Sequence, residues 1–139
     1  MEVLLLLAVE QEIHASIKVS SSNFTWLIST IYASPRLAKR QILWNNLKTV
    51  AHLHNLPWLM LGDFNEVLCG DDKFGGNTVN INKALEFKDC LDKCNMLDLG
   101  FAGPRYTWTN RRPISALILE GLIDALPIHL GELFTRRLR

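Results

Sequence analysis

The stretch "LPWLMLGDFNEVL", residues 56–68, decides the fold of this chain. An apolar run of Trp, Leu and Met ends at Gly62, and its length and composition predict a short buried strand. Four residues of mixed chemistry follow at once: Asp63, Phe64, Asn65 and Glu66. If the backbone stays extended, Asp63 and Asn65 project to one side and Phe64 to the other. The sequence therefore predicts a pair of polar side chains at the end of a rigid strand.

Two interpretations of Asp63 and Asn65 remain open at this point. A carboxylate and an amide oxygen suit a hard cation such as Mg²⁺, which takes few protein ligands and keeps several waters. An Asp can also orient or deprotonate a water that attacks a phosphodiester, and an Asn can hold a phosphate oxygen. Alternatively, the two residues form an Asx turn after the strand. Composition alone favours the turn.

The residues before this stretch predict three strands. Residues 3–9 form an apolar run that is too short to cross a bilayer and lacks the basic residues of a leader, so we expect a buried strand. Residues 11–19 alternate, which predicts a half-buried strand with Ile13, Ala15, Ile17 and Val19 on its buried face and His14 in solvent. Residues 24–34 are rich in aromatic and β-branched side chains and predict its hairpin partner.

Two helices and further strands complete the order of elements. Ser34 and Pro35 predict a helix start, and apolar residues then recur at helical spacing as far as residue 54. Residues 80–95 predict a second helix, capped by Asn80 or Asn82, with a buried stripe of Ala84, Phe87, Leu91 and Cys94. Residues 101–110 and 114–126 predict further strands. This order predicts one α/β domain over residues 1–139, with helices on one face of a sheet.

Composition excludes several classes of protein. The net charge is +1, so the chain as a whole has no electrostatic preference for nucleic acid. From Arg105 onward the sequence contains six Arg and only three carboxylates, which fits either a local basic patch or a solvated end. Three cysteines in no regular framework argue against a disulfide scaffold, and we expect Cys90 and Cys94 to be buried free thiols.

Four blocks together resemble a known family. They are "STIYASPRLAKRQILWNNL", "LPWLMLGDFNEVL", "DDKFGGN" and "DLGFAGPRYTWTNRRP", and they occur in the family's order between residues 29 and 113. They resemble the endonuclease domain of plant non-LTR (LINE-type) retrotransposons, in the endonuclease/exonuclease/phosphatase (DNase I-like) superfamily. The resemblance implies part of a four-layer α/β sandwich that cleaves DNA with Mg²⁺ or Mn²⁺, and an intracellular, nuclear location.

The resemblance also assigns roles to individual residues. Tyr32 matches a tyrosine that contacts the scissile phosphate, although an ordinary strand aromatic is the alternative. Asp63 matches the aspartate that activates water and holds the metal, and Asn65 matches the asparagine that stabilises the phosphoryl transition state. The family's DNA-binding face matches three residues of the fourth block: Trp108, Asn110 and Arg111. For Trp108 the alternative is a core position.

The sequence also departs from the family pattern. The family begins with a strand that carries an Asn, followed by a metal-binding Glu, and it ends in Ser-Asp-His; neither motif is matched here. The segment "ILEGLIDAL" aligns with a family stretch Glu-Arg-Leu-Asp-Arg, so that Ile123 replaces the Asp and Asp124 comes one residue late. In a strand this offset predicts that Asp124 faces the opposite way.

These departures set the functional expectation. We expect a domain that lacks its first and last strands, with weak or no activity alone, or a non-enzymatic remnant with at most residual metal or nucleic-acid binding. A phosphatase acting on a small phosphoester is a third alternative. Uncovered apolar surface predicts marginal stability and self-association through sheet edges.

Overall fold

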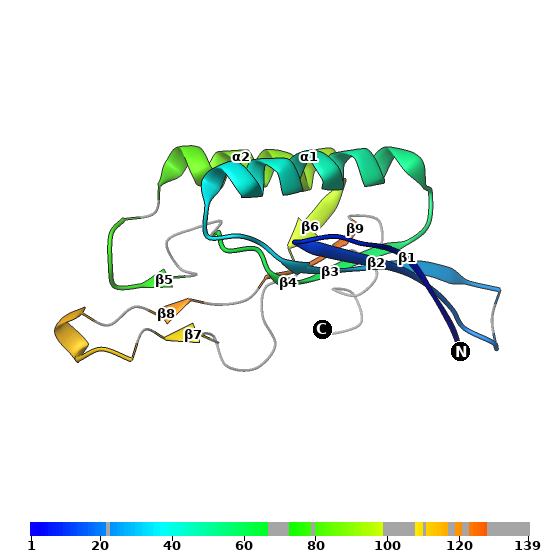
Figure 1. Ribbon diagram of the computed structural model, residues 1–139, viewed down its shortest axis with the longest axis horizontal. Coiled ribbons are helices and arrows are strands. Elements are labelled where there is room, and N and C mark those ends of the chain that lie inside the picture. Colours follow the sequence, from blue (N-terminus) through cyan, green and yellow to red (C-terminus); the bar gives the residue numbers. More distant parts are fainter. Residues whose placement is uncertain are drawn as a thin grey trace, which may run out of the picture.

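The computed structural model describes residues 1–21, 23–66, 73–78, 80–98, 108–109, 111–116, 119–120 and 123–127. The protein has an α/β fold in which two helices lie on one face of a six-stranded mixed sheet of order β1-β2-β3-β4-β9-β6 (Figure 1). The sheet strands are β1 (Glu2–Ala8), β2 (Glu12–Lys18), β3 (Thr25–Tyr32), β4 (Trp58–Asp63), β6 (Met96–Asp98) and β9 (Ile123–Pro127). The helices are α1 (Leu37–Leu53) and α2 (Ile81–Lys93). The predicted α/β class, with helices on one face of a sheet, is confirmed, whereas a four-layer sandwich that lacks its first and last strands stays a prediction.

Strands β3 and β4 are parallel and are joined through α1, whereas β2 and β3 form the predicted antiparallel hairpin. Because β3 and β4 run in the same direction, their carboxyl ends meet at one edge of the sheet. In Figure 1 both strands run toward the left. A second, three-stranded sheet lies at that end; it comprises β5 (Lys73–Phe74), β8 (Leu119–Glu120) and β7 (Trp108–Thr109).

Residues 114–126 do not form the single strand that their apolar composition predicts. The described part of this segment contains a 3₁₀ turn at Ile114–Ala116, then β8 and β9, which belong to different sheets. Strand β9 ends at Pro127, where the sequence predicted a break. Apolar composition cannot show which of two sheets a short strand joins, because it indicates a strand without indicating its partner.

The helix caps differ in how well the sequence predicts them. Helix α2 has Asn80 as its N-cap, and the Asn80 side-chain oxygen accepts a hydrogen bond from the Lys83 amide at 3.3 Å. Helix α1 begins two residues later than predicted: its N-cap is Arg36, which makes no side-chain capping bond. Ser34 instead accepts a bond from the Arg36 amide at 3.2 Å, and so closes the turn that precedes the helix.

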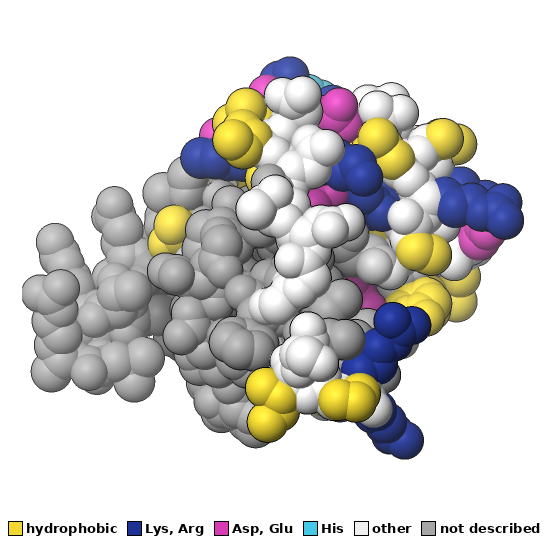
Figure 2. Space-filling view, turned by 90° about the vertical axis from the view of Figure 1, so that its left-hand side faces the viewer, with side chains coloured by type: hydrophobic (Ala, Val, Ile, Leu, Met, Phe, Trp, Pro, Cys, Tyr) yellow, Lys and Arg dark blue, Asp and Glu magenta, His cyan; other side chains and the backbone are white. Residues whose placement is uncertain are grey.

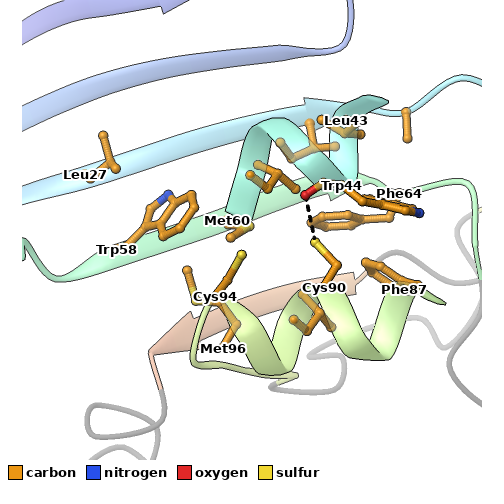
Figure 3. Close-up of a cluster of buried hydrophobic side chains, with 14 residues drawn as sticks. Leu27, Leu43, Trp44, Trp58, Met60, Phe64, Phe87, Cys90, Cys94 and Met96 are labelled. Carbon is orange, nitrogen blue, oxygen red and sulfur yellow. Dashed lines mark hydrogen bonds between the residues drawn. The ribbon is translucent and has the colours of Figure 1, made fainter. Parts of the chain in front are cut away.

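The hydrophobic core lies between the helices and the sheet. Phe64 packs on Trp44 of α1 and Phe87 of α2, with ring-centroid distances of 6.4 Å and 5.2 Å (Figure 3). The predicted stripe of α2 is buried, as are the thiols that were expected to be free, Cys90 and Cys94. The residue after Asp63 is therefore a core residue that anchors the end of β4 to both helices.

Strand β2 faces the opposite way from the prediction. His14 is 2% exposed, whereas Ile13 is 47% exposed, on the face that carries no helix. The Trp58 indole donates to the Ser29 hydroxyl at 2.7 Å, and that hydroxyl lies 2.6 Å from Nδ1 of His14. These bonds give the buried polar groups partners, although Nε2 of His14 has no hydrogen-bond partner among the described residues, and the alternation rule assigns the wrong face.

The prediction for strand β1 is also wrong in one respect, because β1 is not buried. It forms at the predicted place, but all seven of its residues are exposed, including Leu5 at 62%. β1 is an edge strand, and its pairing with β2 shifts register between Leu5 and Leu7. Apolar composition predicts a strand correctly here without predicting what covers it. Among the described residues, no helix is long and apolar enough to cross a membrane.

Candidate active site at the carboxyl ends of β3 and β4

Tyr32 and Asp63 are neighbours across the sheet. They are the last residues of β3 and β4, and their Cα atoms are register partners in the parallel pair. Partners of this kind lie on adjacent strands about 4.8 Å apart and share one face of the sheet. The alternate positions of β3, Leu27, Ser29 and Ile31, are buried beneath the helices, so Tyr32 and Asp63 share the helix-free face. Tyr32 is 72% exposed, which leaves its phenol accessible to a ligand.

The chain turns immediately after Asp63. The Asn65 amide donates to Oδ1 of Asp63 at 2.8 Å, which defines an Asx turn, and Asn65 has a positive φ of 51°. The extended backbone therefore ends at Asp63, and the prediction that alternation aligns the side chains of Asp63 and Asn65 is wrong. The turn that composition favoured is present, and it still leaves both residues at the strand end.

Asn65 also connects the two strand ends. Its Nδ2 donates to the Ala33 carbonyl at 3.0 Å, and the Ala33 amide donates to the Asp63 carbonyl at 2.7 Å. Ala33 directly follows Tyr32, so these bonds fix the position of Asn65 relative to the tyrosine. One amide hydrogen is used in this way, and an Asn side chain has two.

Glu66, the second carboxylate of the motif, pairs with Arg40 of α1. The Nη2–Oε2 distance is 3.0 Å, and the two side chains are only 4% and 9% exposed. Nη1 of Arg40 donates to the carbonyls of Ser34 and Pro35, at 3.0 Å and 2.8 Å. Sequence reasoning missed this arrangement, because Arg40 lies off the apolar stripe of its helix, where charged side chains are ordinarily solvated.

Gln11 holds the same turn from another side. Its side-chain oxygen accepts from the Ser34 amide at 2.7 Å, and its Nε2 donates to the Lys39 carbonyl at 2.9 Å. Its main-chain carbonyl accepts from the Tyr32 amide at 2.9 Å. Nothing in a single sequence identifies Gln11, since a polar residue between two strands is ordinarily part of a turn.

Asp124 lies in β9, which pairs with the strand that carries Asp63. Strand β9 pairs with β4 so that Asp124 is the register partner of Leu61, and Ile123 is the partner of Gly62. Leu61 and Asp63 occupy alternate positions of one strand, so the register position of Asp124 is on the face of Tyr32 and Asp63. Only the main chain of Asp124 is described, so the predicted direction of its carboxylate stays a prediction.

The residues assigned to the DNA-binding face are only partly described. Trp108 lies in β7 of the second sheet, Arg111 is exposed with a φ of 54°, and Asn110 is outside the described residues. Their assignment stays a prediction. Figure 2 looks at the end toward which β3 and β4 run; Lys and Arg side chains there lie in several separate places on the described surface, mixed with acidic and apolar groups.

The described residues contain no cluster of three or more His, Cys, Asp or Glu side chains suited to a metal ion. Cys90 does not supply a ligand, since its thiol points to the Trp44 carbonyl at 3.6 Å (Figure 3). A hydrogen bond with Cys94 and burial both raise the pKa of Cys90. Asp63 thus remains the one predicted metal ligand in the part of the chain that the structure describes.

A pocket of about 240 Å³ lies at the other end of β4. Its walls are Ala51, His54, Asn55, Leu56, Trp58, Cys94 and Asn95. Trp58 is the first residue of β4 and Asp63 the last, so this hollow is separate from the predicted site. Burial is the main cause that lowers the pKa of His54.

The described elements match part of the DNase I-like fold of the endonuclease/exonuclease/phosphatase superfamily. One similar structure is the endonuclease domain of TRAS1, a telomere-specific non-LTR retrotransposon, with a TM-score of 0.74 and 11% identity over 94% of this chain and 57% of that one. Another is the AP endonuclease LMAP from Leishmania major, with a TM-score of 0.67 and 12% identity over 88% and 47%. A third is the human Nocturnin catalytic domain, with a TM-score of 0.54 and 16% identity over 91% and 49%.

These likenesses confirm part of the predicted DNase I-like fold. At such low identity they establish the fold alone, and the chain spans about half the length of the solved structures that it resembles. No protein-family model and no curated protein matches the sequence.

Proposed function

We propose that this chain is part of a metal-dependent phosphodiesterase domain of the DNA endonuclease type, and that it is weakly active or inactive alone. The observation that carries the proposal is the pairing of Tyr32 with Asp63 at adjacent carboxyl ends, with Asn65 bonded to Asp63 and to Ala33, the residue after Tyr32. Polar groups at the end of a rigid strand are well placed to act on a ligand. The fold shared with two endonucleases supports the same reaction class.

Each of the three side chains has a role that its chemistry allows. Asp63 orients a water or accepts its proton, and the second amide hydrogen of Asn65 donates to a phosphate oxygen. The exposed Tyr32 hydroxyl donates to another phosphate oxygen. These groups recognise a phosphodiester and leave the protonation of the leaving oxygen to some other group.

Asp63 is the residue that would hold Mg²⁺ or Mn²⁺. Its Oδ1 already accepts the Asn65 amide, so the fit of the site to a cation rests on a single carboxylate with one oxygen engaged in a turn. Mg²⁺ is held in proteins by as few as one or two carboxylates together with waters and substrate phosphates, so this donor set fits with low affinity. A bound cation would neutralise charge that develops on the phosphate.

Low activity follows from the number of groups at this edge. Losing one preorganised electrostatic partner typically lowers the rate by roughly 10²–10³. Catalytic groups act as a unit, so such losses are not multiplied, but one of them is enough to leave little activity. The register position of Asp124 is where a further carboxylate would complete the set.

A specific observation favours the alternative, a non-enzymatic remnant. Every residue from Asp63 to Glu66 has a structural partner: a turn amide, the aromatic core, the Ala33 carbonyl and Arg40. These contacts account for the "DFNE" segment without any ligand.

The test combines metal binding with nicking of supercoiled plasmid. We expect wild-type protein to bind Mn²⁺ weakly, Asp63→Ala to lose this binding, and exposed Asp89→Ala to keep it. Neither wild type nor Asp63→Ala should nick plasmid above background with Mg²⁺ or Mn²⁺.

Equal Mn²⁺ binding by wild type and Asp63→Ala would support the remnant. Metal-dependent nicking that disappears in Asp63→Ala would show a complete site, and Asp124→Asn would then identify the missing carboxylate. Hydrolysis of a soluble phosphomonoester without nicking would indicate a phosphatase.

A further inference from the structure

Arg40 connects the two loops that carry the candidate site. It lies in the first turn of α1, yet its guanidinium bonds to residues outside the helix on both sides of the site. Nη1 contacts the carbonyls of Ser34 and Pro35, which follow Tyr32 in the chain, and Nη2 contacts Glu66, which follows Asn65. One side chain therefore spans both strand ends.

The cost of burying this ion pair indicates a positional role. Arg40 is 4% exposed, and its Nε is buried without a hydrogen-bond partner among the described residues. Apolar side chains of similar volume often stabilise a fold as well as a buried ion pair does, because both charges must be desolvated. The planar guanidinium does what an apolar side chain cannot, since it fixes three oxygen atoms in one plane at set distances.

The bonds between the two loops are short and few. The Ala33 amide donates to Asp63, and the Asn65 side chain donates to Ala33. Both loops are otherwise turns, and turns open more readily than the strands that precede them. A fixed point on each loop, provided by Arg40, limits the opening of these two bonds.

We propose that Arg40 is a positioning residue for the candidate site, and that with Glu66 it keeps the turn after Tyr32 in register with the Asp63–Asn65 turn. The catalytic meaning of this role rests on the proposed function, but the positioning itself does not. The substitutions Arg40→Lys, which keeps the charge but loses the fork, and Glu66→Gln, which keeps an acceptor but loses the charge, should both loosen the loops.

Amide hydrogen exchange, measured by NMR on the 139-residue chain, tests this inference. In Arg40→Lys the Ala33 amide should exchange about tenfold faster or more, which is the range expected for the loss of a charge-assisted hydrogen bond. The amide of Ile28, in the middle of β3, should be unchanged. The control is Lys88→Gln, which removes an exposed i,i+4 pair with Asp92 on α2 and should alter neither amide.

A double variant, Arg40→Met with Glu66→Met, keeps the experiment decisive if the single variants fold poorly. We expect it to retain the fold and still show fast exchange at Ala33. Unchanged exchange at Ala33 in a folded variant would overturn the proposal, as would an equal acceleration at Ala33 and Ile28, which indicates only lower global stability. If wild type neither binds Mn²⁺ nor nicks DNA, the proposed function fails while the exchange result stands on its own. If Mn²⁺ binds and Ala33 exchange is the same in Arg40→Lys, only the positioning role fails.

Discussion

Replacing Gly62 with Ala should destabilise the protein more than any other single-methyl addition in this region. Gly62 precedes Asp63 and has a φ of +135°, in the region that side chains disfavour. A Cβ at this position would lie 2.0 Å from the main-chain oxygen of Ile31 and 2.9 Å from its carbonyl carbon and its nitrogen. Ile31 is the register partner of Gly62 in β3, so the clash falls within the strand pair that holds the site.

The magnitude has two sources. Holding a non-glycine residue at a strained φ costs roughly 1–3 kcal/mol. Forcing an extra methyl into a closely packed region costs about 1–3 kcal/mol more. This cost applies at Gly62, because the neighbouring atoms belong to the main chain of Ile31 and cannot rotate away. The loss of about 2–6 kcal/mol is a large part of the roughly 5–15 kcal/mol that stabilises a typical domain.

Urea unfolding followed by tryptophan fluorescence measures this loss. The matched control is Gly75→Ala, because Gly75 also has a positive φ, 77°, but is exposed in a loop. The control should lose only the conformational part, about 1 kcal/mol, with an unchanged dependence on urea concentration. Equal losses at Gly62 and Gly75 would refute the steric argument and would mean that β3 and β4 separate easily at this point.

Three further predictions follow from the same contacts. Burial lowers the pKa of His54 below its ordinary value of 6.5, so the unfolded chain binds more protons below that pH, and stability should fall as the pH drops from 7 toward 5. His54→Gln should flatten this pH dependence of the urea midpoint, and an unaltered slope would assign it to other groups. Leu5→Lys, in the exposed strand β1, should reduce concentration-dependent association in sedimentation experiments; a wild type that is monomeric at all concentrations would contradict this. Asp63→Asn keeps an oxygen for the Asn65 amide but loses the charge, so it should leave unfolding within about 0.5 kcal/mol of wild type while abolishing Mn²⁺ binding. A large loss of stability instead would assign the carboxylate a structural role.

The sequence predicts most helices and strands well, because the spacing of apolar residues reflects which face of each element is buried in the core. The apolar stripe of α2 fits only one face of a helix. The apolar run that ends at Gly62 has the length of a short buried strand, so both elements can be assigned from the sequence. The same logic fails for β2, where the polar face lies under the helices. His14 is buried there with Ser29 of β3 as its partner, and Trp58 of β4 bonds to the same hydroxyl. Partners distant in sequence leave no local pattern.

Some residues of the candidate site could be identified from the sequence and others could not. Asp63 and Asn65 could be selected from their position at the end of a predicted strand, whereas Tyr32 was selected through the family resemblance. The parallel pairing of β3 and β4 brings the two strand ends together. Arg40 could not be selected, since its partner Glu66 is 26 residues away and helical periodicity places it among solvated cations. The register of Asp124 could not be predicted either, because it depends on how β9 pairs with β4.

The motif after Gly62 has a structural role and a proposed functional role. Asp63 and Asn65 close the turn and tie it to Ala33, and these bonds would be needed whether or not the site binds anything. Yet the same bonds give a carboxylate and an amide fixed positions beside an exposed tyrosine, which is the preorganisation that phosphoryl chemistry requires. The turn and the metal site are therefore compatible interpretations. Only a substitution that keeps the hydrogen bond and removes the charge, such as Asp63→Asn, can separate them, because any truncation removes both.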